Sequence, residues 1–182
     1  MKKPVICVAG SANMDLVTTV QRMPMAGETI HGNAFKTYFG GKGANQAVMA
    51  AKLGGEVWMI AKIGEDTFGK DYMKNFAACG LNTSYVYSTK DASTGIAAIT
   101  VQENGQNAII VVGGANLSFI EEEIEKAAAA IRKADVLVCQ NEINLDATLR
   151  FLQIARAQGV PTIFNPAPAQ DFPEEIYRLC DY

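Results

Sequence analysis

Short apolar runs rich in β-branched residues alternate with helical patterns along the chain, and this alternation restricts the possible fold more than any other feature. The apolar runs are residues 5–9, 57–63, 136–139 and 160–164. They are apolar on both faces, which is typical of the central strands of a parallel sheet. Helical patterns follow at residues 44–53, 68–79, 119–133 and 146–158. The alternation predicts a doubly wound α/β layer sandwich with a mostly parallel central sheet.

Two segments interrupt this rhythm, at about residues 15–38 and 94–113. The first alternates polar and apolar residues and contains Pro24 and Gly27. The second is typical of a β-hairpin, because two apolar runs flank an Asn104-Gly105 turn. These extra strands are expected to form a small separate β-sheet within a single domain of residues 1–182.

Composition excludes several classes of protein. The formal net charge is −3 with no basic stripe, which argues against a nucleic-acid partner. The apolar runs are much shorter than the roughly 20 residues of a membrane-spanning helix, and the first one is interpreted as a strand rather than a signal peptide. The four cysteines are widely spaced, without a Cys-x-x-Cys pair. They are expected to be reduced thiols in a cytoplasmic protein.

A glycine-rich loop, Gly40-Gly41-Lys42-Gly43, precedes the first helical pattern. It is not a nucleotide P-loop, because the first glycine of that motif is missing and Gly43 replaces the hydroxyl residue that would bind magnesium. A dinucleotide fingerprint is also absent, because the first strand is followed by a single glycine at Gly10. Spacing alone leaves two alternatives open, a ligand-binding loop or a flexible turn that caps a helix.

Polar side chains near this loop favour ligand binding. Asn13 and Asp15 follow the first strand, Lys42 and Asn45 flank the start of a helix, and Glu142 follows the strand at residues 136–139. Ligands of open α/β sheets bind beyond the carboxyl ends of the strands. Carboxylates, an amide, an ammonium group and bare glycine N–H groups together suit vicinal hydroxyls, whereas the two carboxylates would repel a phosphate. The alternatives are that Asp15 caps a turn, Asn45 caps a helix and Lys42 is a solvated lysine.

Several motifs together resemble the ribokinase branch of the PfkB carbohydrate kinase family over essentially the whole chain. They are Gly10-Ser11-x-Asn13-x-Asp15, Pro24-x-x-Gly27-Glu28-Thr29, Gly40-Gly41-Lys42-Gly43-Ala44-Asn45-Gln46-Ala47, Gly64-Glu65-Asp66-x-Phe68-Gly69, Gly113-Gly114-Ala115-Asn116, Gln140-x-Glu142 and Asn165-Pro166-Ala167-Pro168-Ala169. The glycine-rich motif is the specific signature. The resemblance implies a ribokinase-like three-layer sandwich in which the small β-sheet is a lid. One departure is Asn141, which stands where the family usually has an apolar residue.

The resemblance also implies a role for each matched residue in sugar binding. Asn13 and Asp15 would hydrogen-bond the sugar hydroxyls, and Glu142 would contact the sugar from the main sheet. The remaining contacts would come from the glycine-rich helix start and from an apolar lid wall, namely Gly41, Lys42, Asn45 and Ile99. The lid of such kinases covers the sugar and pairs with a second subunit, so a homodimer is expected.

By the same resemblance, the parent protein would transfer the ATP γ-phosphoryl group to O5 of D-ribose with Mg²⁺, and a monovalent cation, K⁺, would assist. The catalytic base, the magnesium and phosphate segment, the adenine pocket and the cation site are expected beyond Tyr182. No catalytic residue and no metal ligand is therefore assigned to this chain. A general base is typically worth about 10²–10⁴-fold in rate, so the 182-residue chain alone is predicted to be inactive.

Other functions share some of these features. A naturally short sugar-binding or regulatory module would use the same sugar contacts without catalysis. An NAD-dependent oxidoreductase is disfavoured by the single glycine at Gly10. A kinase for another pentose, such as deoxyribose, would differ from a ribokinase at the site that recognises one hydroxyl.

Overall fold

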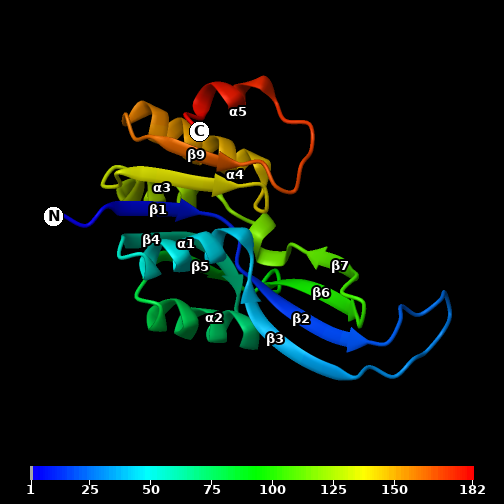
Figure 1. The fold of residues 1–182 in the computed structure, drawn as a ribbon. Helices are drawn as coiled ribbons and strands as arrows, with labels where there is room; N and C mark the ends of the chain where they lie inside the picture. The colour runs from blue at the N-terminus through cyan, green and yellow to red at the C-terminus, as the bar shows by residue number, and fades with distance from the viewer. Residues whose placement is uncertain (1) are drawn as a thin grey trace.

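A computed structural model describes residues 2–182, and its main body is built on a five-stranded sheet (Figure 1). The strand order is β5-β4-β1-β8-β9, and every neighbouring pair is parallel. The strands are β1 (Val5–Ala9), β4 (Glu56–Gly64), β5 (Asn82–Thr89), β8 (Val136–Gln140) and β9 (Thr162–Asn165). The mostly parallel central sheet expected from the alternating pattern is confirmed.

Helices cover both faces of this sheet and make the fold a three-layer sandwich (Figure 1). The helices are α1 (Lys42–Lys52), α2 (Thr67–Ala78), α3 (Glu121–Ile131), α4 (Leu145–Ala157) and the short α5 (Glu174–Leu179). Alternate residues of β1 belong to different cores: Val8 packs with α1 and α2, whereas Cys7 and Ala9 pack with α3 and α4. This division explains why the central strands are apolar on both faces.

A second, four-stranded sheet projects from one end of the main sheet (Figure 1). Its order is β3-β2-β6-β7, with strands β2 (Asn13–Val20), β3 (Ala34–Gly40), β6 (Gly95–Gln102) and β7 (Asn107–Val112). β2 is parallel to β6, and the outer pairs are antiparallel. The small sheet expected from the sequence is therefore present, and β2 begins at Asn13, three residues after Gly10.

Some boundaries differ from the sequence-based expectation. β5 was not expected, because its sequence NTSYVYST contains a single aliphatic residue and it lies at the edge of the sheet. Helix α1 begins at Lys42 rather than at residue 44, with Gly41 as its N-cap. All four cysteines are free thiols, as expected, and Cys7 and Cys139 are buried in the core. None of the helices within residues 2–182 is long and apolar enough to cross a membrane.

Candidate functional site

The glycine-rich loop packs directly onto the segment that joins β1 to β2. Gly41 has a φ of 87°, and a Cβ added there would lie 2.8 Å from the backbone nitrogen of Asn13. A Cβ added at Gly43 would lie 2.6 Å from the backbone nitrogen of Ser11. Only glycine fits at both positions, because the obstructing atoms belong to the backbone. The glycines therefore bring the start of α1 against residues 10–13.

Glu142 is tied to this junction by three hydrogen bonds. Its Oε2 atom accepts from the Ser11 hydroxyl at 2.6 Å and from the Lys42 backbone N–H at 2.8 Å, and its Oε1 atom pairs with the Lys42 ammonium group. Burial raises the pKa of Glu142, but these hydrogen bonds and the Lys42 charge outweigh it and leave the pKa below its ordinary value. Glu142 is therefore an ionised carboxylate held at the N-terminus of α1.

Asp15 is the second carboxylate of the site, and it differs from Glu142 in having no hydrogen-bond donor among residues 2–182. It lies on β2 opposite Tyr38 of β3 and Ala97 of β6. A Cβ added at Gly40 would lie within 2.5 Å of the Asp15 carboxylate. The absence of a side chain at Gly40 therefore makes room for the Asp15 carboxylate. Burial and then the negative charge of Glu142 raise the pKa of Asp15, and the charge of Lys42 partly opposes them. Asp15 is thus an unpaired acceptor whose pKa is affected by the charges of Glu142 and Lys42.

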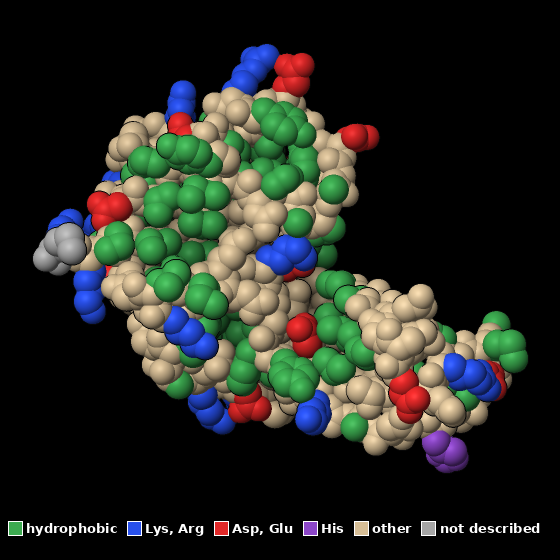
Figure 2. Space-filling view, viewed as in Figure 1, with side chains coloured by type: hydrophobic (Ala, Val, Ile, Leu, Met, Phe, Trp, Pro, Cys, Tyr) green, Lys and Arg blue, Asp and Glu red, His purple; other side chains and the backbone are tan. Residues whose placement is uncertain are grey.

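A cavity of about 380 Å³ lies between the main body and the second sheet. Asn13 and Glu142 both line it, together with Val111, Gly113, Leu117, Asn141, Ile143, Asn144, Leu145, Pro168 and Gln170. Figure 2 shows the molecule hollowed between its two parts, with basic and acidic side chains at the inner end of the hollow. Residues from the carboxyl end of β8 and from β2 therefore meet at one place, as the position of ligand sites in α/β sheets predicts.

Of the seven predicted sugar-binding residues, Asn13 and Glu142 line the cavity, whereas Asp15, Gly41, Lys42, Asn45 and Ile99 do not. Asn45 and Ile99 lie on the neighbouring elements α1 and β6. Asn45 is exposed on α1, three residues after Lys42 and hence on the same side of the helix. It is not the helix N-cap, so that alternative interpretation is wrong. Ile99 is half-buried on β6, two residues after Ala97, and therefore shares the face of the sheet that contains Asp15. The roles of both residues in ligand binding stay predictions.

Two further residues of the site were not assigned a role from the sequence. Ser11 is fully buried, and besides bonding Glu142 it accepts a hydrogen bond from the Gly43 backbone N–H at 3.3 Å. Asn116 is also fully buried and bonds both Ala12 and Asn13. Both residues belong to motifs that the sequence displays, but Ser11 bonds Glu142 and Asn116 bonds Ala12 across more than 100 positions of the chain.

The unusual residue Asn141 also has a structural partner. Its side-chain amide donates to the Pro168 carbonyl at 2.7 Å and accepts from Gln170 at 3.3 Å. These bonds join the loop after β8 to the loop after β9. The polar residue that departs from the family pattern therefore links two loops beside Glu142.

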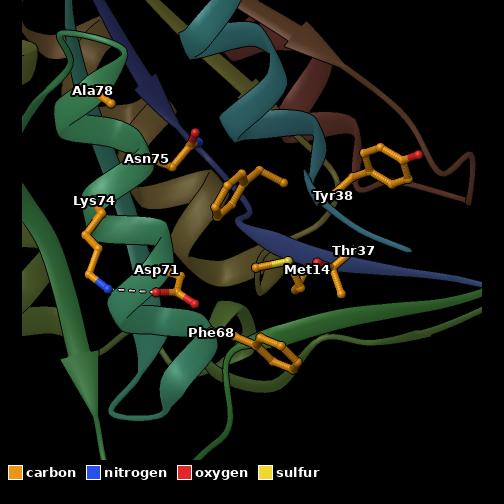
Figure 3. Close-up of a pocket in the computed structure, with 9 residues that line it drawn as sticks. Met14, Thr37, Tyr38, Phe68, Asp71, Lys74, Asn75 and Ala78 are labelled. Atoms are coloured by element: carbon orange, nitrogen blue, oxygen red, sulfur yellow. Dashed lines mark hydrogen bonds and ion pairs between the residues drawn. The ribbon is translucent and has the colours of Figure 1, made fainter. Parts of the chain in front are cut away.

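A different cavity, also of about 380 Å³, lies against α2 on the opposite face of β2 and β3 (Figure 3). Met14 and Thr37 contribute to it, and they alternate along their strands with Asp15 and Tyr38. Its charged residues Asp71 and Lys74 pair with each other at 2.9 Å. None of the predicted sugar-binding residues lines this cavity. The candidate site is therefore the cluster of Asn13, Asp15, Lys42 and Glu142.

Comparison with known proteins identifies the family. Residues 3–182 match the pfkB family carbohydrate kinase pattern. Ribokinase of Mus musculus is 47% identical over 175 residues, covering 96% of this chain and 54% of the mouse protein. Deoxyribokinase of Salmonella typhi is 40% identical over 178 residues, covering 97% of this chain and 58% of that protein.

A solved structure of Arabidopsis thaliana ribokinase complexed with ribose and ATP matches with a TM-score of 0.86 at 33% identity, over 100% of this chain and 59% of that one. The chain thus spans between half and three-fifths of the length of these relatives. It has both the fold and the sequence pattern of the group, and it belongs to the PfkB family of carbohydrate kinases.

Proposed function

We propose that this chain supplies the sugar-binding half of a kinase that transfers the γ-phosphoryl group of ATP to O5 of D-ribose. The supporting observation is the group formed by Asp15, Lys42 and Glu142 beside Asn13, at the junction of the two sheets. Ribokinase of Mus musculus, at 47% identity, favours ribose as the sugar. The product would be ribose 5-phosphate.

The residues of this group keep hydrogen-bonding capacity for a polyol. Asp15 accepts no hydrogen bond from residues 2–182, so both of its oxygens are available to sugar hydroxyls. The Lys42 ammonium group has three donors, of which one is used by Glu142. Each hydrogen bond that involves a charged group contributes about 1.5–3 kcal/mol. Gly41 and Asn45 at the start of α1 and Ile99 on β6 would complete the enclosure of the sugar ring.

ATP, Mg²⁺ and K⁺ are assigned to the part of the protein outside residues 1–182. The cavity beside Asn13 suits a neutral polyol better than a nucleotide, because Glu142 lines it and Asp15 lies nearby, and both carboxylates would repel phosphate oxygens. The Arabidopsis thaliana structure with ribose and ATP is a longer chain, of which 59% matches this one. When bound, ATP would supply the phosphoryl group, while the residues of this chain bind and orient the sugar.

A second copy of the chain is the proposed partner of the second sheet, whose role would be that of a lid over the sugar. Phe35 and Ile110 are 61% and 70% exposed, and the strand registers place them on the same face. They lie on the two edge strands of this sheet, and large apolar side chains exposed on one face of a sheet are typical of an interaction surface. The proposed assembly is a cytoplasmic homodimer, which sedimentation of the full-length protein would test.

The decisive experiment is an ATP-coupled assay of the full-length protein with D-ribose and with 2-deoxyribose. Faster turnover of ribose supports the proposal. Faster turnover of 2-deoxyribose would favour the second candidate, a deoxyribokinase, which the 40% identity to the Salmonella typhi enzyme suggests. Sugar binding without turnover in the full-length protein would indicate a non-catalytic binding module. The isolated 182-residue chain is expected to give no turnover in the same assay.

A further inference from the structure

The orientation of the Asn116 side-chain amide is fixed by backbone groups. Its Oδ1 atom accepts from the Ala12 N–H at 2.9 Å, and its Nδ2 atom donates to the Gly113 carbonyl at 3.0 Å. A backbone N–H only donates and a carbonyl only accepts, so the reversed amide would lose both bonds. Because Asn116 is fully buried, water cannot replace them.

This orientation also determines how Asn13 is presented. The Asn116 Nδ2 atom donates to the Asn13 Oδ1 atom at 2.7 Å, so Asn13 must turn its oxygen toward Asn116. The Asn13 Nδ2 atom then remains for the cavity that Asn13 lines, and no acceptor within residues 2–182 bonds it. We propose that Asn116 is a positioning residue that makes Asn13 a hydrogen-bond donor to the bound sugar. This inference rests on the proposed function.

Contacts of the neighbouring backbone hold the Asn13 and Asn116 side chains in place. Asn116 lies in the short 3-10 helix η1 (Gly114–Leu117), where the Ala115 N–H donates to the Ser93 carbonyl at 2.8 Å. The Lys62 ammonium group donates to the Ser118 carbonyl, directly after η1, at 2.6 Å. A Cβ at Gly95 would lie 2.1 Å from Asn13 Oδ1 and 2.2 Å from Asn116 Nδ2. Glycine at this position therefore leaves the room that the amide pair requires.

A donor at Asn13 complements the acceptor at Asp15. Both residues lie on one face of β2, two positions apart and hence about 7 Å along the strand. A sugar hydroxyl that bridges them gives its only hydrogen to the Asp15 carboxylate and must accept its second bond from Asn13. If the Asn13 amide were reversed, two acceptors would compete for that hydrogen. Asn116 thus acts on the recognition of a hydroxyl although it lies outside the cavity.

The test is the Asn116→Asp variant of the full-length protein. One carboxylate oxygen would keep the Ala12 bond, and the other would face Asn13, which must then turn its Nδ2 atom away from the sugar. We expect the KM for ribose to rise about tenfold, as for the loss of roughly 1.4 kcal/mol of hydrogen bonding. The kcat and the KM for ATP should remain unchanged. Asn104→Asp, in the exposed hairpin turn between β6 and β7, is the matched control for the added charge.

The readout that separates positioning from a general loss of structure is hydroxyl discrimination. In the wild type, kcat/KM for ribose is compared with that for its 2-deoxy and 3-deoxy analogues, and the larger ratio identifies the bridging hydroxyl. That ratio should fall about tenfold in Asn116→Asp and stay constant in Asn104→Asp. An equal loss for all three sugars, or no loss, would overturn the inference.

Asn13→Asp is the second variant, because it keeps an acceptor for Asn116 but removes the donor to the sugar. It should lower the same discrimination ratio, and an unchanged ratio would overturn the inference even if Asn116→Asp failed to fold. If the wild-type protein phosphorylated and bound none of the sugars, the proposed function itself would be wrong. With an active wild type and unchanged ratios, only the role of Asn116 would be wrong.

Discussion

Lys42 and Glu142 lie 100 positions apart in the sequence and are joined twice, once through the Lys42 backbone N–H at 2.8 Å and once through its ammonium group. These two hydrogen bonds hold the start of α1 and the loop after β8 together. Asp15 lies close enough for its pKa to be affected by both residues but is bonded to neither. The site therefore contains one satisfied carboxylate and one unsatisfied carboxylate, and this asymmetry leads to the first two predictions.

Asp15→Asn should weaken sugar binding while stabilising the fold. In the proposed site the variant would lose hydrogen bonds from the sugar to a charged acceptor, which corresponds to a rise in sugar Kd of about 10- to 100-fold. Burial and the Glu142 charge raise the pKa of Asp15, so the ionised carboxylate destabilises the folded state. Calorimetry of the full-length protein should therefore show weaker ribose binding and a higher unfolding temperature. A lower unfolding temperature would indicate that Asp15 has a structural role.

The acid limb of the pH profile for sugar binding should move in opposite directions in Lys42→Met and Glu142→Gln. In the proposed site, the ionised form of Asp15 is the stronger acceptor for sugar hydroxyls, and its pKa is raised by Glu142 and lowered by Lys42. Lys42→Met should move the acid limb to higher pH, and Glu142→Gln should move it to lower pH. The position of the limb in a plot of log(kcat/KM) for ribose against pH is the measurement, because both variants are also expected to bind sugar more weakly. A shift of the same sign in both variants would contradict this assignment.

Asp15 and Glu142 make opposite contributions to the pH dependence of the free energy of unfolding. The raised pKa of Asp15 makes its contribution favourable at low pH, and this contribution is lost as pH rises through its ordinary value toward the raised one. The lowered pKa of Glu142 stabilises the fold above the ordinary glutamate pKa, and this contribution is lost as pH falls through the lowered value. Acid titration of unfolding should therefore become steeper in Asp15→Asn and shallower in Glu142→Gln.

Ser11→Ala should affect binding through Glu142. The buried hydroxyl donates to Glu142 at 2.6 Å and accepts from Gly43, so its removal costs about 1.5–3 kcal/mol of stability. Chemical denaturation should show this loss, and the KM for ribose should rise because Glu142 is less firmly held. Ser84→Ala, at an exposed position of β5, is the control and should change neither quantity. Unaltered stability in Ser11→Ala would mean that Glu142 does not depend on this bond.

Gly43→Ala should be more harmful than Gly54→Ala, although only the second glycine has a positive φ. A Cβ at Gly43 would meet the backbone of Gly10 and Ser11 at 2.6 Å, so α1 must move away from the strand junction. Gly54 has a φ of 96° and nothing within 4 Å, so its substitution costs only the left-handed backbone conformation, about 1–2 kcal/mol. Denaturation should give the larger loss for Gly43→Ala, at least about 3 kcal/mol. Equal losses would mean that the loop relaxes without cost.

The sequence by itself determined the fold class, the presence of a second small sheet and the membership of the glycine-rich loop in a recognisable motif. These features depend on local periodicity and on turn residues such as Asn104-Gly105, which act within a few positions. The edge strand β5 was missed because its sequence has a weak apolar pattern and because an edge strand need not be buried on both faces.

Only the tertiary structure decided which polar groups are paired and which remain free. The bonds from Ser11 and Lys42 to Glu142, and from Asn116 to Asn13, join positions that are 100 or more apart. Such pairs depend on the distance between the end of β8, the start of α1 and the crossing of β2 into the second sheet. A sequence pattern specifies the residues that reach this junction, but the hydrogen-bond geometry there is set by how the two sheets meet.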